Sequence, residues 1–317
     1  MNDSLPPIRF QQLRKSYGSL VAVAELSLDV AAGEIFGLIG PDGAGKTTAM
    51  RVACGLLLPD SGDVHIAGFS SSTQTAEIKK HLGYMPQRFS LYPDLSVEEN
   101  LRFFADLYEV PEQERREHEE RLMQFSRLGP FRTRRAGKLS GGMKQKLALS
   151  CNLIHTPEVL ILDEPTTGVD PVSRQEFWQI LRELAAEGKA LLVSTPYMDE
   201  ALLCHRVALM HHGHVIASGT PPEVTQKFAR RLVEVKGHDL SAARKTLTDL
   251  EREGIDVNRF GDRLHLVCDT PEQEQLVHTR LSGLDLSIQA IPPTIEDTFV
   301  ALMADEKNGA VSTTAPE

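Results

Sequence analysis

Features that define several other protein classes are missing from this chain of 317 residues. No apolar run reaches the roughly 18 residues of a membrane span, and the start MNDSLPPIRF lacks the basic and apolar parts of a signal peptide. Any contact with a membrane must therefore pass through a partner. The few cysteines form no CxxC pair and have mostly apolar neighbours, so we expect reduced core thiols of a cytosolic protein. They are Cys54, Cys151, Cys204 and Cys268.

An excess of positive charge is also missing. The formal net charge is −10, whereas nucleic-acid-binding proteins present a basic surface, so we expect no nucleic-acid partner. One short basic cluster lies at residues 132–138, and a solvated loop is its simplest interpretation. With 41% hydrophobic and 25% charged residues, the composition is that of a globular protein with a sizeable core.

Strand-like and helix-like stretches alternate through the first two thirds of the chain. The short, continuously apolar runs 34–40, 158–164 and 190–195 are typical of parallel strands that are buried on both faces. Residues 98–128 have a charged, helical pattern and predict an inserted helical lobe over about residues 88–155. The sequence therefore predicts an α/β domain, which we assign to residues 1–222.

A break rich in proline and glycine at residues 217–224 separates a second unit. Its pattern is strand, helix, strand, strand, helix, strand, which predicts a small α+β module of the ferredoxin-like type over residues 223–306. Nothing in this module indicates chemistry. We expect residues 307–317 to form a disordered polar tail.

The segment GPDGAGKTT follows a buried apolar run and opens a helical pattern, as a P-loop requires. Successive backbone N–H groups of such a loop curl around phosphates, Lys46 reaches the terminal phosphates, and the Thr47 hydroxyl can bind Mg²⁺. The predicted ATP-binding residues here are Gly40, Pro41, Asp42, Gly43, Ala44, Gly45, Lys46, Thr47 and Thr48.

Two adjacent carboxylates end the apolar run before residue 165. Asp163 is expected at the carboxyl edge of the sheet, where nucleotide sites form, and is suited to hold Mg²⁺. Glu164 is the better candidate for polarising an attacking water. The alternative, an ordinary surface glutamate, has less to support it beside a metal ligand.

A second anion-binding pattern lies about a hundred residues after the P-loop. In KLSGGMKQK, Ser140, Gly141 and Gly142 precede a helical run and leave its first N–H groups free for an anion. One P-loop already serves one triphosphate. The pattern therefore predicts two cassettes arranged head to tail, each nucleotide clamped between the P-loop of one and the serine-glycine turn of the other.

Taken together, residues 8 to about 222 resemble the ATP-binding cassette of ABC transporters, a P-loop NTPase fold with a RecA-like core and a helical lobe. The further motifs are GYMPQ with Gln87, LSGGM, LILDEP and GVDP with Asp170. The resemblance implies that Tyr17 stacks on adenine and that Gln87 senses the terminal phosphate or Mg²⁺. It also implies that Asp170 lies at the dimer interface and that the lobe docks on a membrane permease.

The C-terminal module and the wording of several motifs are similar to ATP-binding subunits of bacterial ABC-2 type exporters, including drug-resistance and polysaccharide-lipid systems. GPDGAGKTT, LYPDLSVEENL and KLSGGMKQKL resemble the first half of tandem two-cassette subunits. The resemblance implies ATP hydrolysis with Mg²⁺ that powers export through separate permease subunits at the cytoplasmic face of the bacterial inner membrane.

One position departs from the family pattern. Pro196 stands where relatives carry a histidine that contacts the terminal phosphate, and proline offers no side-chain donor and no backbone N–H. His205, expected inside a helix, is a poor substitute. We therefore expect slow turnover at this chain's own site and favour a heterodimer with a complete cassette. The alternatives are a mainly regulatory cassette, a soluble ABC ATPase that acts on ribosomes or DNA, and, less favoured, an importer ATPase.

Overall fold

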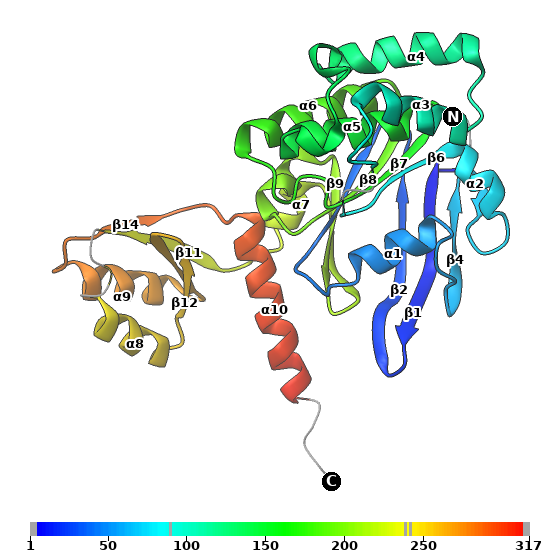
Figure 1. The fold of residues 1–317 in the computed structure, drawn as a ribbon. Coiled ribbons are helices and arrows are strands. Elements are labelled where there is room, and N and C mark those ends of the chain that lie inside the picture. Colours follow the sequence, from blue (N-terminus) through cyan, green and yellow to red (C-terminus); the bar gives the residue numbers. More distant parts are fainter. Residues whose placement is uncertain (1–4, 89–90, 238–239, 241–242, 313–317) are drawn as a thin grey trace. The chain divides into compact units, whose positions relative to one another are not determined.

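The computed structural model describes residues 5–88, 91–237, 240 and 243–312. The chain divides into two compact units, Met1–Pro221 and Pro222–Glu317, so the first unit ends one residue before the boundary expected from the sequence. Both units combine helices and strands (Figure 1). Among the described residues, no helix combines the length and the apolar character that crossing a membrane requires.

A six-stranded sheet forms the centre of the first unit, in the order β10-β9-β3-β8-β7-β6. All neighbours are parallel except β10, which pairs antiparallel with β9. Its strands are β3 (Ile35–Ile39), β6 (Leu82–Met85), β7 (Val159–Asp163), β8 (Ala190–Thr195), β9 (Arg206–His211) and β10 (His214–Gly219). Every residue of β3, β7 and β8 is buried, which confirms the prediction from the three apolar runs.

A four-stranded antiparallel sheet, in the order β2-β1-β4-β5, covers helix α1 (Lys46–Ala53) from the other side. Its strands are β1 (Ile8–Tyr17), β2 (Leu20–Val30), β4 (Ser61–Ile66) and β5 (Phe69–Ser70). The shared core includes Ile8 of β1, Met50 of α1 and Ile161 of β7, all fully buried. Because both sheets pack on α1, the start of this helix has a fixed position beside the end of β3.

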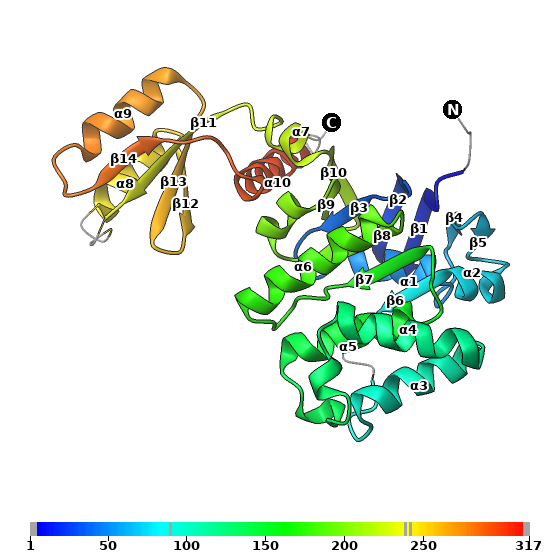
Figure 2. The same cartoon turned by 90° about the horizontal axis from the view of Figure 1, so that it is seen from above.

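Helices cover the opposite face of the central sheet and form the helical lobe (Figure 2). They are α3 (Val97–Leu107), α4 (Glu112–Phe125), α5 (Gly141–Leu153) and α6 (Pro171–Ala186). Helix α2 (Thr75–His81) instead buries Ile78 in the core that contains α1. The helical stretch expected over residues 98–128 is interrupted between α3 and α4. Pro111 precedes α4, and the residue before a proline disfavours helical geometry. Ser96 and Glu99 form a capping box at the start of α3.

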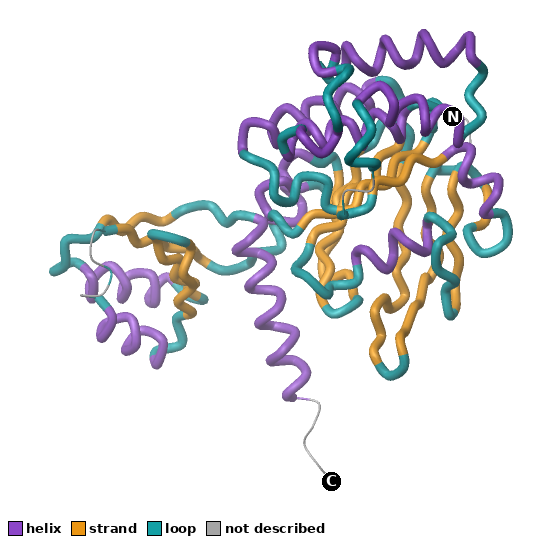
Figure 3. Tube along the Cα trace, in the orientation of Figure 1, coloured by secondary structure: helices purple, strands orange, loops and turns teal. Residues whose placement is uncertain are grey.

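The second unit has a four-stranded antiparallel sheet in the order β12-β13-β11-β14. Figure 3 shows which parts of the chain are helix and which are strand. The elements that follow α7 (Pro221–Thr225) are β11 (Arg231–Lys236), α8 (Arg244–Arg252), β12 (Asp256–Phe260), β13 (Arg263–Cys268), α9 (Pro271–Leu281), β14 (Ser287–Ala290) and α10 (Ile295–Ser312). Leu264, Leu266 and Cys268 face a common core with α8 and α9, as their alternation predicts. The expectation of a disordered tail from residue 307 is wrong as far as Ser312, because α10 continues to that residue. Residues 313–317 lie outside the described residues.

The four cysteines are free and buried, as the sequence predicts. Burial raises the pKa of the Cys268 thiol to about 11 and that of the Cys151 thiol still further. A thiol that stays protonated is a poor nucleophile and a poor metal ligand, so these side chains act as small apolar core groups.

Candidate nucleotide site

The loop between β3 and α1 contains the predicted phosphate-binding residues. Gly45 has φ +104°, and a Cβ at this position would lie 2.1 Å from the carbonyl oxygen of Ala22 on β2. Gly43 also has a positive φ of +79°. Residues other than glycine rarely adopt a positive φ, so these glycines allow the loop to turn sharply into α1. The turn leaves the first N–H groups of α1 available to an anion.

Lys46 lies at the start of α1 with only 4% of its surface exposed. Its ammonium donates hydrogen bonds to the carbonyl oxygens of Gly40 and Pro41, at 2.8 and 3.0 Å. It also lies 3.5 Å from the Oε1 atom of Glu164. These partners hold a buried positive charge at the centre of the loop, where phosphate oxygens can replace them.

Asp163 ends β7 and is almost fully buried. Its Oδ1 atom accepts hydrogen bonds from the hydroxyls of Thr47 (3.0 Å) and Ser194 (2.7 Å). The Thr47 hydroxyl and the Asp163 carboxylate thus supply neighbouring hard oxygen atoms. Mg²⁺ binds through one or two such groups together with phosphates and waters, so these two residues fit the predicted ion.

Glu164 follows Asp163 and adopts the left-handed backbone conformation, with φ +49°. Its backbone N–H donates to the Ser194 hydroxyl at 3.0 Å, and its Oε2 atom accepts from the side-chain amide of Gln87 at 2.8 Å. Thr167 adds a longer hydrogen bond of 3.3 Å to the same oxygen. A non-glycine residue rarely holds this conformation without fixed surroundings. These contacts hold the Glu164 carboxylate between the P-loop lysine and Gln87.

A cleft of about 500 Å³ opens over these groups, a volume typical of small-molecule sites. Its lining residues are Tyr17, Leu20, Val21, Ala22, Asp42, Gly43, Ala44, Gly45, Lys46, Thr47, Thr48, Gln87, Glu164 and His212. Tyr17, at the end of β1, is 48% exposed and available for stacking. Gly40, Pro41 and Asp163 are not lining residues and contact the cleft through Lys46 and Thr47.

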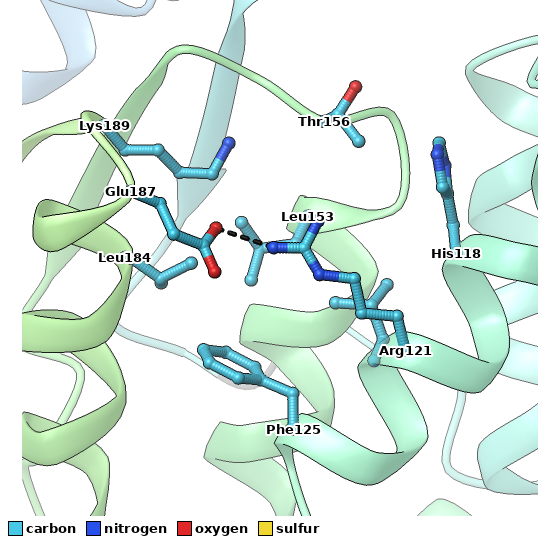
Figure 4. A pocket seen from close by; sticks show the side chains of 9 residues that line it. His118, Arg121, Phe125, Leu153, Thr156, Leu184, Glu187 and Lys189 are labelled. Atoms are coloured by element: carbon cyan, nitrogen blue, oxygen red, sulfur yellow. Dashed lines mark hydrogen bonds and ion pairs between the residues drawn. The ribbon is translucent and has the colours of Figure 1, made fainter.

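Another cavity lies away from the P-loop, between α4, α5 and the segment after α6 (Figure 4). Its enclosed volume is about 40 Å³. Arg121 and Glu187 lie at its edge and form an ion pair of 2.7 Å between the lobe and the core. This volume has room for one or a few waters but not for a nucleotide.

The serine-glycine turn forms the start of α5. The Ser140 hydroxyl accepts a hydrogen bond from the N–H of Met143 at 3.3 Å and thus caps the helix. Ser140 and Gly141 are exposed, while Gly142 packs so closely on Ser173 that a Cβ there would lie 2.5 Å from its hydroxyl oxygen. None of the three glycine and serine residues of the turn lines the cleft of this chain.

Asp170 is the N-cap of α6. Its carboxylate accepts a hydrogen bond from the N–H of Ser173 at 2.9 Å, and this bond lowers the pKa of Asp170. Pro171 follows at the first position of the helix, where a missing N–H costs nothing. In this structure, Asp170 therefore connects the loop after Glu164 to α6, a helix that packs on the central sheet.

Pro196 directly follows β8. The next histidine along the chain, His205, does not replace the imidazole that is missing at this position. His205 accepts a hydrogen bond from the N–H of Ile35 at 2.9 Å, at the end of β3 that is opposite the P-loop. The expectation that His205 lies inside a helix is wrong, because the short 3₁₀ helix there ends at Leu203. His205 is nevertheless committed elsewhere, as expected.

Sequence patterns missed three residues near the site. The Ser194 hydroxyl donates to the Asp163 carboxylate and accepts from the backbone N–H of Glu164, as described above. Glu200, 1% exposed, accepts hydrogen bonds from Thr166 (2.7 Å) and Thr195 (2.5 Å), so it joins the loop after β7 to the end of β8. His212 lines the cleft from the turn between β9 and β10. The only signal for Glu200 was its place in the polar segment that follows Pro196.

Comparison with known proteins agrees with this geometry. Residues 23–167 match the family model described as "ABC transporter". The chain is 50% identical over 233 residues to "Probable multidrug ABC transporter ATP-binding protein YbhF" of Escherichia coli K12, covering 73% of this chain and 40% of that protein. It thus spans less than half the length of that relative. It is 38% identical over 307 residues to "Nod factor export ATP-binding protein I" of Burkholderia thailandensis, covering 96% of this chain and 99% of that protein.

Solved structures give the same result. A dimeric structure of MJ0796, titled a bacterial ABC transporter cassette, has a TM-score of 0.61 and 25% identity and covers 67% of this chain and 98% of that one. A second dimeric structure of MJ0796, in a post-hydrolysis state with ADP and Pi, has the same TM-score. The chain therefore belongs to the family of ABC transporter ATP-binding proteins, the ATPases of ABC transporters.

Proposed function

We propose that this chain powers export through a separate permease of the ABC-2 type and that its cargo is of a multidrug or lipid-like class. The observation that carries the proposal is the meeting of Lys46, Thr47, Asp163, Glu164 and Gln87 at one cleft. The relatives support the export direction, because their names contain multidrug transport and Nod factor export.

In the proposed reaction, Lys46 exchanges its two carbonyl partners for oxygens of the terminal phosphates. Tyr17 stacks on the adenine, and the P-loop N–H groups hold the phosphate chain. Bound Mg²⁺, held by Thr47, Asp163 and Gln87, would neutralise charge on the phosphates. Glu164 orients and polarises the attacking water, and closure of the cleft keeps other water molecules away from the phosphates.

The proposal requires a second cassette over the cleft. Ser140 and Gly141 are exposed and do not line this chain's own cleft, so their capped helix start is available to the nucleotide of another chain. The dimeric cassette among the similar solved structures supports such a pair. In that arrangement the triphosphate joins the two chains, and hydrolysis removes the charged bridge.

A permease-docking surface is part of the same proposal. Tyr92, Phe103 and Leu107 are exposed on the helical lobe at 47%, 36% and 61%, and the first two rings contact edge to face at 4.6 Å. Tyr92 lies five residues after Gln87, so this apolar surface is close in sequence to a residue that contacts Glu164. Docking there holds the ATPase at the cytoplasmic face of the inner membrane.

The pairing partner is proposed to be a different cassette. Pro196 supplies no donor beside the cleft, and His205 is bound to the backbone of β3, so hydrolysis at this chain's own P-loop is slow. The same observation favours one second candidate, a mainly regulatory cassette that closes on ATP but rarely hydrolyses it.

Trapping tests the paired arrangement. Cysteine replaces Ser140 in this chain and, in the companion cassette, the residue equivalent to Asp42, while glutamine in place of the companion's equivalent of Glu164 slows hydrolysis at the site that Ser140 faces. We expect ATP to produce a disulfide across the two positions, and Thr270→Cys in place of Ser140→Cys to produce none. Absence of the ATP-dependent crosslink in the assembled complex with its permease would exclude the shared site.

The Pro196→His variant separates the two candidate roles. If the missing imidazole limits turnover, the variant hydrolyses ATP several-fold to about tenfold faster in the assembled complex. If transport itself is unchanged by both Pro196→His and Glu164→Gln, the regulatory role is favoured over the driving one. A chain that purifies with ribosomes or DNA and not with membranes would instead indicate a soluble ABC ATPase.

A further inference from the structure

The turn between β9 and β10 places a histidine at the nucleotide cleft that none of the family motifs includes. His212 and Gly213 form this two-residue turn, with φ values of +45° and +83°. Both positions therefore have the left-handed geometry of a type I′ hairpin turn, which asparagine, aspartate or glycine usually occupies first. Histidine also tolerates this geometry, but unlike those residues it gains a positive charge near neutral pH.

Backbone contacts fix the position of His212 relative to the P-loop. The N–H of Gly213 donates to the carbonyl oxygen of Ala44 at 3.0 Å, and the carbonyl oxygen of Gly213 accepts from Ala24 at 2.8 Å. A Cβ on Gly213 would lie 3.0 Å from the carbonyl oxygen of Ala22. The turn is thus held against the middle of the P-loop on one side and against β2 on the other.

The His212 side chain is exposed and lines the cleft together with residues of the P-loop and the β1–β2 turn. Within the part of the chain that the structure describes, its ring nitrogens form no hydrogen bond; its ring contact is with His211, at 4.0 Å between centroids. Such a ring can donate a hydrogen bond to an oxygen of a bound polyphosphate. Among the described cleft residues, it adds to Lys46 a second group that can be positive.

Several ionisable groups surround His212. The described ones that line the cleft with it are Asp42 and Lys46 on the P-loop, Tyr17 at the end of β1 and Glu164 across the cleft. His211, on the same hairpin, contacts the His212 ring. The negative charge of a bound phosphate chain favours the protonated form of an imidazole that faces it.

We propose that His212 is a nucleotide-binding residue that donates a hydrogen bond, in its protonated form, to the ribose–α-phosphate part of ATP or ADP. This part is favoured because the neighbouring Gly213 is held at Ala44 and against Ala22, whereas the terminal phosphates belong at Lys46 and Glu164. The inference rests on the proposed nucleotide site. It makes nucleotide affinity depend on pH through a residue of the β9–β10 turn.

Calorimetric titration of the full chain with Mg-ATP and Mg-ADP at pH 6.0 and pH 8.0 tests the proposal. Ligand titration affects every variant equally, so the informative quantity is the ratio of affinities at the two pH values. We expect His212→Asn, which suits the turn, to lower this ratio by about three- to tenfold, the effect of one charge-assisted hydrogen bond. His212→Arg, with a permanent charge, should restore tight binding at pH 8.0.

Two controls make the outcome decisive. His214→Asn changes another exposed histidine of the same hairpin that does not line the cleft, and it should keep the ratio of the unchanged protein. Lys46→Ala should abolish binding at both pH values; if it does not, the proposed nucleotide site itself is wrong. If Lys46→Ala abolishes binding but His212→Asn keeps the original ratio, only the role of His212 is refuted.

Discussion

The nucleotide cleft and the C-terminal module each contain a cluster of buried charges, and the two clusters differ in what their partners are. In the module, the ring of His265 lies 2.6 Å from Asp297 and 3.7 Å from Glu234, and Arg263 binds Glu234 at 3.0 Å. The ionisable groups of the module are thus partners of one another. At the cleft, by contrast, the hydrogen bonds of Lys46 go to backbone carbonyls, and its ionic contact with Glu164 is longer, at 3.5 Å.

This difference indicates that the charged groups of the module stabilise its fold, whereas Lys46 at the cleft is available to bind a ligand. Asp297 lies on α10 and His265 on the central part of the sheet, so their contact joins helix to sheet within the module. Removing either partner leaves a buried charge without compensation. The carbonyl partners of Lys46 are neutral, and a phosphate can replace them at little cost.

The largest expected effect distinguishes the two clusters by activity. Glu164→Gln should lower ATP turnover at this chain's own site at least about 100-fold while nucleotide binding persists, because the amide cannot polarise water. Steady-state hydrolysis and calorimetric binding in the assembled complex measure the two effects. The matched change in the module, Glu234→Gln, should leave turnover unchanged. Equal turnover by Glu164→Gln and the unchanged protein would remove Glu164 from the reaction.

The next effect distinguishes the clusters by stability. Asp297→Ala should destabilise the module by about 3 kcal/mol, because it isolates His265 and removes an acceptor for the N–H of Thr294 at the start of α10. Urea unfolding followed by far-ultraviolet circular dichroism measures the loss. Asp262→Ala, at an exposed carboxylate 3.6 Å from Arg263, is the control and should cost less than about 0.5 kcal/mol. Equal unfolding midpoints for the two variants would contradict the structural role of Asp297.

The sequence predicted well those parts of the molecule that depend on neighbours along the chain. The P-loop, the two carboxylates after β7 and the cap at Asp170 all follow from short patterns of strand, turn and helix. The ferredoxin-like strand order was likewise expected from the alternation of elements. Local patterns do not show how far a polar helix continues, and α10 accordingly reaches Ser312, inside the segment that the sequence predicts to be a disordered tail.

Contacts between distant segments account for most of what was missed. Ser194 reaches Asp163 across 31 positions, and His265 reaches Asp297 across 32. The local sequence around these residues does not predict the distant partner, because serine and histidine also occur in strands and loops where they have no such contact. The left-handed backbone of Glu164 is a further example, since the surrounding contacts and not the glutamate itself impose it.

A smaller effect concerns a partly buried histidine that pairs with no carboxylate among the described residues. His155 donates from Nε2 to the carbonyl oxygen of Leu82 at 3.2 Å and stacks on Tyr108 at 3.8 Å. Burial lowers the pKa of His155 from 6.5 to about 4. Between about pH 4 and 6.5, His155 therefore binds a proton in the unfolded chain but not in the folded chain. The contribution of His155 to stability is complete above about pH 6.5 and is lost as the pH falls toward 4.

Urea unfolding at pH 7.5 and pH 5.0 measures this dependence. His155→Gln keeps a donor for Leu82 but does not titrate, so it should lose about 1–2 kcal/mol less than the unchanged protein on acidification. His118→Gln is a useful control, because its ring also bonds a backbone carbonyl, that of Ile154, at 2.9 Å. An identical loss in His155→Gln and the unchanged protein would assign the acid sensitivity to other groups.

The smallest effect compares two helix caps of the same chemistry, one at the proposed joint with a second cassette and one in the module. Ser140 caps α5 through the N–H of Met143, and Thr270 caps α9 through the N–H of Gln273, both at 3.3 Å. Replacing either hydroxyl by alanine should cost about 1 kcal/mol of stability, measured by urea unfolding.

ATP-dependent pairing should respond differently to these two substitutions. Ser140→Ala should weaken pairing, measured by size-exclusion chromatography of the Glu164→Gln complex with ATP, because we propose that the hydroxyl faces the nucleotide of the other chain. Thr270→Ala should leave pairing unchanged, since its cap has no ligand to meet. If both variants lose stability alike and pair alike, Ser140 is only a helix cap, and the exposed start of α5 no longer supports a shared triphosphate.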